Sequence, residues 1–374
     1  MIWLAGGGLP CLAMTPIRFE GMGEKMDAYA KLAELAAKKA AKMDEEDRMD
    51  RELIEMAFDS GLMAVTIPEK YGGLGKSFRD LCELAEELGK VNAGFAVSVA
   101  AHHMAANTIN LSGSDELKEK WLPKLCKKLA AFATTEPKAG SDLKSIELEA
   151  GEEGDFYILN GNKTLITNAE LAESFVVLAR CGDGFSLFVV ERKDGIEVRK
   201  LNAGGMRGSG LASIRFNEVE VPKEDSIPNG LKAVMKTLTA SRPVFSAIGL
   251  GIAERCIELA IKYAKERKAF GKSISEFQGI QWMLAEVAAD IEALRLLVYN
   301  AAEKCNAVSS ATCKLFAAKT AKKAADVAVE IFGGHGTLRG AAVERAYRDA
   351  KMLDIGEGTS EIMKLIIARE LLKE

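Results

Sequence analysis

The feature that most limits the fold of this chain is a change of periodicity near residue 131. Before that point, residues 24–130 hold long stretches rich in alanine, glutamate, lysine and leucine, which are typical of helices. After it come short runs of β-branched and aromatic residues, separated by glycine-rich turns over about 100 residues. Beyond residue 229 the helical pattern returns. The sequence therefore predicts an α+β, mostly α chain, in which a β domain stands between two helical domains.

In the first helical part, helices are expected over 24–58 and 78–88. Between them lies Ile67–Gly75, where one proline and three glycines rule out a continuous helix. The segment Ser112–Asp115 then offers a turn and an N-cap before a helix over 116–128.

The middle segment is expected to contain a hairpin, with strands over 156–159 and 163–166 joined at Asn160-Gly161, because Asn-Gly is a preferred two-residue turn. Further short β-rich runs occupy 175–180, 185–190, 196–201 and 212–216. Many short strands with turn signals between them predict an antiparallel barrel or sandwich, which ends near Val221-Pro222.

The last part is expected to form a four-helix bundle. An apolar seam with spacing 4-3-4-3-4 predicts one of its helices and consists of Ile280, Leu284, Val287, Ile291, Leu294 and Val298. The other helices are expected over 242–268, 311–332 and 359–372. The predicted domains are then an uncertain N-terminal extension (1–22), a helical domain (23–130), a β domain (131–229) and a helical bundle (230–374).

Composition excludes several classes of protein. Of the 374 residues, 48% are apolar and 28% charged, with a net charge of −4, which is ordinary for a soluble globular protein and gives no sign of a nucleic-acid partner. No apolar run reaches the roughly 18 residues of a membrane span. The first residues are apolar but lack the basic start of a signal peptide. Seven scattered cysteines without a C-x-x-C pair indicate reduced thiols in a cytoplasmic protein, and three histidines are too few for most histidine-based metal sites.

One carboxylate, Glu357, stands between Gly356 and Gly358 in a segment that joins two helical stretches. Glycines on both sides allow tight turn geometry and close approach of a ligand to the backbone. A carboxylate held on such a turn can act as general base for a C–H proton in a dry pocket. Taken alone, the segment fits a solvated glutamate on a glycine-rich surface loop better than it fits a catalytic base.

Four other segments carry groups suited to a phosphate or a heterocycle, and each also has an ordinary structural explanation. Thr134–Asp142 concentrates hydroxyl and N–H groups, but fits a domain-boundary turn as well. Thr167 can donate to a ring nitrogen or simply end a strand. Arg267 can bind a pyrophosphate or complement the dipole of the helix it ends. Residues 331–336 form a helix stop or a place of close backbone approach. No P-loop or complete dinucleotide fingerprint is present.

Together, seven motifs resemble the acyl-CoA dehydrogenase flavoproteins. They occur in the order of that family, from about residue 50 to the C-terminus, on the matching helix–strand–helix layout. The motifs are Ile67-Pro68-x-x-Tyr71-Gly72-Gly73-x-Gly75, Thr135-Glu136-Pro137-x-Ala139-Gly140-Ser141-Asp142, Ile166-Thr167-Asn168, Glu266-Arg267-x-x-Phe270-Gly271, Gly333-Gly334-x-Gly336, Arg348-Asp349-Ala350-Lys351 and Glu357-Gly358-Thr359-Ser360.

The resemblance implies that FAD lies between the β domain and the C-terminal helices, with its adenine end reaching a neighbouring subunit of a homotetramer built as a dimer of dimers. The positions implied to line the flavin and its phosphates are Phe132, Thr134, Thr135, Gly140, Ser141, Leu165 and Thr167, with Ser141 also within reach of substrate. The positions implied to hold the ADP part are Arg267, Phe270, Gln278, Glu330, Gly333, Gly334, Thr359 and Glu361.

The implied reaction is α,β-dehydrogenation of an acyl-CoA thioester to the trans-2-enoyl-CoA, as in fatty acid β-oxidation. Glu357 matches the base that removes the α proton while flavin N5 takes the β hydride. Its backbone N–H and a flavin ribityl hydroxyl are implied to polarise the thioester carbonyl. Arg242 and Gly358 match positions beside the substrate, and electron-transfer flavoprotein is the implied electron acceptor.

Several positions depart from the pattern of the family. Leu165 replaces a tryptophan beside the flavin, Glu330 replaces a glutamine, and Gly356 replaces a tyrosine and is expected to widen the pocket. Part of the family carries its base where Ser241 stands here, and has the Ile-Gly lead-in seen at Ile355-Gly356. Two alternatives stay open: a flavin oxidase or other-substrate enzyme of the same fold, and a non-catalytic scaffold. The pocket floor is expected on the helix around residues 95–106, with Ser98, His102, His103 and Met104 as candidates.

Overall fold

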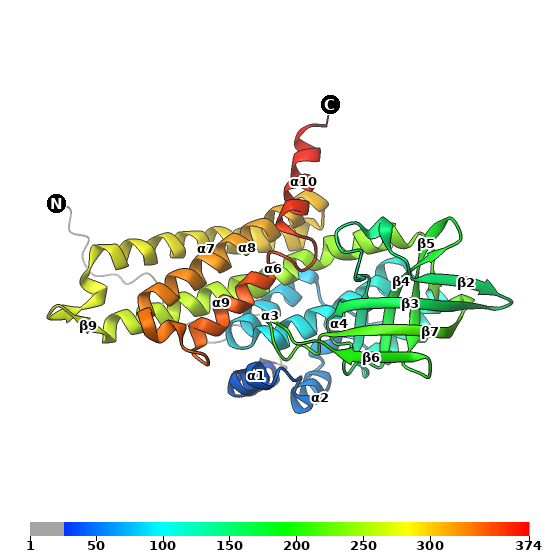
Figure 1. Cartoon of the computed structure of the whole chain (residues 1–374), viewed down its shortest axis with the longest axis horizontal. Helices are drawn as coiled ribbons and strands as arrows, with labels where there is room; N and C mark the ends of the chain where they lie inside the picture. The colour runs from blue at the N-terminus through cyan, green and yellow to red at the C-terminus, as the bar shows by residue number, and fades with distance from the viewer. Residues whose placement is uncertain (1–25, 374) are drawn as a thin grey trace.

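The computed structural model describes residues 26–373, so the expected N-terminal extension over 1–22 lies outside the described residues. The molecule is elongated, with a β-sheet at one end and three long helices, α6, α7 and α8, extending toward the other (Figure 1). No helix in the described range is long and apolar enough to cross a bilayer. The predicted order of helical, β and helical parts is confirmed.

The N-terminal part is helical and its helix starts are capped by side chains. Its helices are α1 (Met26–Glu46), α2 (Arg51–Asp59), α3 (Phe78–Val91), α4 (Ala93–Ser112) and α5 (Asp115–Leu125). Ser114 accepts a hydrogen bond from the Leu117 N–H at the start of α5, which confirms the predicted N-cap. The break between α1 and α2 was not predicted, and it occurs where Asp50 caps α2 by accepting from the Leu53 N–H.

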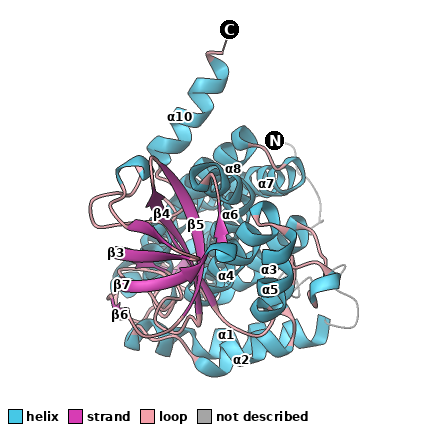
Figure 2. Ribbon diagram, turned by 90° about the vertical axis from the view of Figure 1, so that its right-hand side faces the viewer, coloured by secondary structure: helices cyan, strands magenta, loops and turns pink. Residues whose placement is uncertain are grey.

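The middle part is a single mostly antiparallel sheet. Its strands are β1 (Ala130–Ala133), β2 (Glu149–Glu153), β3 (Phe156–Ile166), β4 (Ser174–Cys181), β5 (Gly184–Glu191), β6 (Ile196–Lys200), β7 (Ala212–Pro222) and β8 (Ser226–Ile227). The strand order is β6-β7-β3-β2-β4-β5-β8, and β4 also pairs in parallel with β1 and, at one position, with β2. Along β4, Val176 and Leu178 pack with Trp121 of α5, while Phe175 and Val177 pack inside the β domain. Strand β4 is therefore buried on both faces and joins the β domain to the first helices (Figure 2).

The predicted hairpin at Asn160-Gly161 is wrong, because β3 runs unbroken through both residues. The pairing of β3 with β7 shifts register between Leu159 and Gly161, which makes this dipeptide a β-bulge. Gly161 has φ +144°, and a Cβ atom there would lie 2.7 Å from Cα of Leu148. The Asn160 side chain accepts a hydrogen bond from the Glu218 N–H. The residues that suggested a turn instead bend one long strand.

The C-terminal part consists of α6 (Gly230–Glu266), α7 (Gln278–Lys304), α8 (Ala307–Phe332), α9 (Ala342–Met352) and α10 (Ser360–Leu371). Along α7, Val287, Ile291, Leu294 and Val298 are buried, as the seam predicted. Helix α9 was not predicted. Helix α10 projects away from the body of the molecule (Figures 1 and 2).

The predicted start of α6 at Arg242 is wrong, since the helix begins at Gly230 and continues through Pro243. A proline inside a helix leaves the carbonyl four residues earlier without its N–H donor. Here that carbonyl belongs to Thr239, and it accepts a hydrogen bond of 2.7 Å from the Ser310 hydroxyl of α8. A tertiary contact thus replaces the missing bond and allows the helix to continue.

Candidate active site

Glu357 lies on the turn between α9 and α10, as predicted. Its φ is +56° and that of Gly358 is +100°, so two successive residues are in left-handed conformations. Asp354 closes the turn, since its backbone oxygen accepts from the Ser360 N–H at 3.0 Å and its carboxylate from the Ser360 hydroxyl at 2.8 Å. The side chain of Thr359 caps α10 by accepting from the Ile362 N–H. The turn is therefore held on both sides by hydrogen bonds.

Two neighbouring residues of α6 contact Glu357. The hydroxyl of Ser241 donates to Oε2 of Glu357 at 2.8 Å, and Nε of Arg242 donates to the Glu357 backbone oxygen at 3.1 Å. The residue as a whole is partly exposed, but its carboxyl group is desolvated. Burial raises the pKa of this carboxyl to about 7, against the opposing effects of the Ser241 hydrogen bond and the charges of Arg242 and Lys314. An acid with this pKa can take and release a proton near neutrality.

Two buried cations lie behind the turn. Arg242 and Lys314 are each only 1% exposed. Nζ of Lys314 donates to the Gly358 backbone oxygen at 2.5 Å, while Nη1 of Arg242 is buried without a hydrogen-bond partner in the described part of the chain. Sequence reasoning missed Lys314. The available signal was its register, because it lies three residues before Ala317 on the buried stripe of α8 that continues through Ala321.

The expected widening of the pocket at Gly356 is not found. A Cβ atom at this position would lie 2.9 Å from Cζ of Phe245, whose ring is buried against the turn. The space beside Gly356 is therefore occupied by an aromatic ring of α6 rather than left open.

A second group of predicted residues meets where β1 and β3 end. The Thr164 N–H donates to the Thr135 oxygen at 2.9 Å, and Nζ of the fully buried Lys163 donates to the Thr134 oxygen at 3.1 Å. Lys163 also donates to Oε1 of Glu136 at 2.7 Å. The Glu136 carboxylate in turn accepts two backbone N–H groups, those of residues 147 and 148. This network fixes the backbone that carries Thr134 and Thr135.

Thr167 is positioned by its neighbour Asn168, which is fully buried. The Asn168 amide donates to the backbone oxygens of Ser98 and Ala130, and its Oδ1 accepts from the Ser98 hydroxyl at 2.6 Å. Phe132 and Thr167 are partly exposed, whereas Gly140, Ser141 and Leu165 are exposed, Leu165 to 58%.

Three of the four pocket-floor candidates on α4 are occupied by other contacts. Ser98 binds Asn168, as described above. His102 accepts from the Ala130 N–H, and His103 bonds to Thr66 and to the Leu62 oxygen. Burial lowers the pKa of His102 to about 3 and that of His103 to about 4, so both rings are neutral. Met104 alone of the four keeps partial exposure.

A third group lies at the far end of α6. Arg267, Gly333 and Gly334 line one cleft of about 450 Å³, together with Tyr263, Ile274, Ile331, Phe332, His335 and Leu338. A Cβ atom at either glycine would meet nothing within 4 Å, so the backbone there is open to a ligand. Phe270 is 95% exposed beside the hairpin of β9 (Lys268–Ala269) and β10 (Lys272–Ser273), and Gln278 and Glu330 are exposed.

The second group, around Thr134 and Thr167, lies far from the third group, around Arg267, within one chain. Helix α6 begins at Gly230 against β4 and β5 and ends at Glu266 beside the cleft of Arg267. Its 37 residues span about 55 Å at a rise of 1.5 Å per residue. The sheet and the β9–β10 hairpin accordingly lie at opposite ends of the molecule (Figure 1). Thr359 and Glu361 belong to neither group, since they start α10 beside the Glu357 turn.

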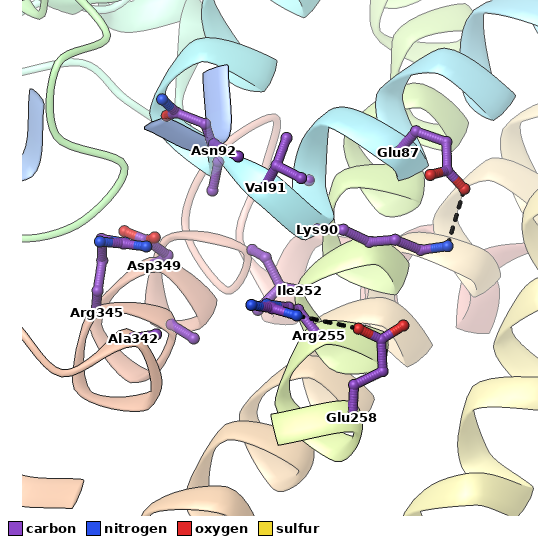
Figure 3. Close-up of a pocket in the computed structure, with 14 residues that line it drawn as sticks. Glu87, Lys90, Val91, Asn92, Ile252, Arg255, Glu258, Ala342, Arg345 and Asp349 are labelled. Carbon is purple, nitrogen blue, oxygen red and sulfur yellow. Dashed lines mark hydrogen bonds and ion pairs between the residues drawn. The ribbon is translucent and has the colours of Figure 1, made fainter. Parts of the chain in front are cut away.

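Another cleft, of about 270 Å³, lies between α3, α6 and α9 (Figure 3). Its three basic side chains, Lys90, Arg255 and Arg345, are balanced by three acidic ones, Glu87, Glu258 and Asp349; Lys90 pairs with Glu87 and Arg255 with Glu258. It contains none of the predicted site residues. The cleft therefore carries no excess of positive charge that would favour an anionic ligand such as a nucleotide.

Comparison with known families and structures gives a consistent result. Three family models match successive parts of the chain: acyl-CoA dehydrogenase N-terminal domain (residues 25–128), middle domain (131–219) and C-terminal domain (228–372).

Among curated relatives, the short-chain specific acyl-CoA dehydrogenase of Clostridium acetobutylicum is 38% identical over 352 residues, covering 89% of this chain and 93% of that protein. Butyryl-CoA dehydrogenase from Megasphaera elsdenii superposes with a TM-score of 0.90 at 33% identity, covering 96% and 99% of the two chains. A chain solved in work on the electron transferring flavoprotein of Acidaminococcus fermentans superposes with a TM-score of 0.91 at 36% identity, covering 95% and 98%.

Proposed function

The chain belongs to the acyl-CoA dehydrogenase family of FAD-dependent oxidoreductases, and on this premise we propose that it converts an acyl-CoA thioester to the trans-2-enoyl-CoA with Glu357 as the base. The observation that carries the proposal is the Glu357 turn. A desolvated carboxyl group with a pKa of about 7 stands there between two buried cations and a hydroxyl donor. A general base works best when its pKa lies near the working pH.

The same turn offers donors for the thioester carbonyl. The N–H groups of Ile355 and Gly356 bond to the Met352 oxygen. Those of Glu357 and Gly358 have no acceptor within residues 26–373. A free N–H aimed at a developing negative charge lowers the barrier to its formation. We assign the Glu357 N–H to the thioester carbonyl, because an unpolarised α C–H group is too weak an acid for a carboxylate.

The residues present fit FAD. The side-chain hydroxyls of Thr134, Thr135 and Thr167 make no hydrogen bond within the described chain, so they are available to the polar edge of a flavin. Arg267 has no ion-pair partner there and shares its cleft with two unobstructed glycines, as a pyrophosphate would require. When bound, FAD supplies the acceptor for the hydride that leaves the β carbon. The substrate then loses one proton, to Glu357, and one hydride.

The separation of the flavin-edge and pyrophosphate groups supports an oligomer. Because the sheet and the β9–β10 hairpin lie at opposite ends of the molecule (Figure 1), one FAD can contact both groups only where two copies of the chain meet. Apolar side chains exposed on α7 and α10 suit burial against other copies, and they are Trp282, Leu296, Leu365 and Leu371. We assign a homotetramer built as a dimer of dimers.

Electron-transfer flavoprotein is the proposed oxidant of the reduced enzyme. The similarity to the chain from the A. fermentans work supports this assignment. The exposed Leu165, where the family usually has a tryptophan, favours one alternative, an oxidase that passes electrons to oxygen. Hydrogen peroxide produced under air in proportion to the acyl-CoA consumed would select the oxidase.

Glu357→Gln tests the assignment of the base. The variant is expected to bind FAD and acyl-CoA but not to bleach the flavin anaerobically, because an amide cannot take the α proton. Undiminished bleaching would overturn the proposal. A panel of straight and branched acyl-CoAs with the wild-type enzyme would identify the substrate.

A further inference from the structure

Two buried cations hold two consecutive carbonyl groups of the catalytic turn. Nε of Arg242 on α6 donates to the Glu357 oxygen at 3.1 Å, and Nζ of Lys314 on α8 donates to the Gly358 oxygen at 2.5 Å. We propose that Lys314 is a positioning residue, which holds the turn in its working conformation and stabilises the ionised form of Glu357. This inference rests on the function proposed above.

The environment of Lys314 is an unusual one for a lysine. The side chain is 1% exposed and continues the stripe of buried alanines along α8. No carboxylate of the described chain lies within ion-pair distance of its ammonium, whose one hydrogen bond there is to Gly358. Burying an ammonium group costs free energy that an apolar residue of the same length would avoid. The contact with the turn accounts for a charge at this place.

The turn needs such support. Left-handed φ at Glu357 is uncommon for a residue with a side chain, and it persists only where surrounding contacts impose it. Arg242 and Lys314 draw the carbonyl oxygens of residues 357 and 358 toward α6 and α8. Among the described residues, the N–H groups of the same two residues have no acceptor, as a carbonyl-polarising site requires. Losing Lys314 therefore loosens the donor and the base together.

Electrostatics gives a second consequence. The groups that act on Glu357 are the Ser241 hydroxyl and the charges of Arg242 and Lys314. Burial lowers the pKa of Lys314 to about 8, and the charge of Arg242 also lowers it. The charges of Glu357, Asp354 and Glu361 act in the opposite direction. The buried thiol of Cys313 has a raised pKa and stays neutral. With the Lys314 charge removed, the Glu357 carboxyl loses a stabilising cation and its pKa rises.

The test compares three variants by stopped-flow anaerobic flavin reduction, across pH 6 to 9. The substrate is the acyl-CoA that reduces the wild-type enzyme fastest in a panel from butyryl- to palmitoyl-CoA. Lys314→Met keeps the length of the side chain without charge or donor, Lys314→Gln keeps a donor, and Lys314→Arg keeps the charge. Lys319→Met is the matched control, on the exposed side of the same helix.

Lys314→Met is expected to slow reduction about tenfold or more at pH 7 and to raise the apparent pKa of the rate by about 1. Lys314→Gln should show the same rise in pKa with a smaller loss of rate, and Lys314→Arg should retain the wild-type pKa. A pH profile in Lys314→Met that matches wild type overturns the inference. If Lys314→Met does not bind FAD, the inference is tested by comparing the apparent pKa of Lys314→Gln with that of Lys314→Arg.

Failure of the inference is distinguishable from failure of the proposed function. An inactive Glu357→Gln with a wild-type pH profile in Lys314→Met removes the role of Lys314 alone. Undiminished flavin bleaching in Glu357→Gln removes the base itself.

Discussion

The Ser241 hydroxyl donates a hydrogen bond of 2.8 Å to Oε2 of Glu357, across the contact between α6 and the α9–α10 turn. The family resemblance implies that some members carry their base at position 241. The short distance means that a carboxylate at either position would reach the same place, so the proposed mechanism needs only one of them. Two carboxylates there would repel each other, and one would be kept protonated.

Ser241→Ala should raise the pKa of Glu357, because the hydrogen bond from Ser241 favours the ionised carboxylate. A hydrogen bond to a charged group contributes about 1.5–3 kcal/mol, so an apparent pKa higher by about 1 to 2 is expected in anaerobic flavin reduction. Ser241→Thr keeps the hydroxyl and should behave as wild type. An unchanged pH profile in Ser241→Ala would show that the hydroxyl does not act on the base.

The pH dependence of the wild-type enzyme follows from the pKa of Glu357. Burial raises this pKa from 4.5 to about 7, and only the ionised carboxylate can accept a proton. The reduction rate at low substrate concentration should therefore fall about tenfold for each pH unit below 7 and level off above it. A rate that stays constant from pH 7 down to pH 5 would mean that the free carboxyl group titrates as an ordinary surface glutamate.

Ser310→Ala should destabilise the protein through α6. The Ser310 hydroxyl serves the Thr239 carbonyl that Pro243 leaves without an N–H donor, and its loss leaves a buried acceptor unpaired. Such a loss costs about 1–3 kcal/mol of unfolding free energy, measurable by urea denaturation. In a Pro243→Ala background residue 243 regains its N–H, so Ser310→Ala should cost less there. Equal costs in both backgrounds would contradict this role.

The parts of the structure that sequence predicted best are those in which a local pattern and the tertiary contacts agree. The apolar spacing from Val287 to Val298 is compatible only with a helix, because it places all of these side chains on one helix face. Glu357 was likewise placed on its turn by the glycines beside it. The turn at Asn160-Gly161 was wrong because the same dipeptide suits a bulge, and only pairing with β7 decides between them.

Other features depend on partners far along the chain. The helix was predicted to start at Arg242, next to Pro243, whereas Ser310, from another helix, allows α6 to continue through the proline. Lys314 resembles a solvated lysine in sequence, because the carbonyl that it binds belongs to a turn 44 residues later. The filling of the space at Gly356 by Phe245 is equally non-local.

The proposed sharing of FAD between two subunits predicts complementation between two defective variants. Thr167→Arg should block the flavin edge, and Arg267→Glu should repel the pyrophosphate at the other end of the chain. Each should weaken FAD binding by at least about tenfold in its own homo-oligomer, and an unchanged melting temperature of the FAD-free protein is the control for folding. In a dimer with one copy of each variant, one FAD site contains both substitutions, Thr167→Arg and Arg267→Glu. The other FAD site contains neither. Hybrids obtained by co-expression and purified through a different tag on each copy should then regain half the wild-type FAD content. Hybrids that remain as colourless as the two homo-oligomers would show that Thr167 and Arg267 of one subunit serve the same FAD.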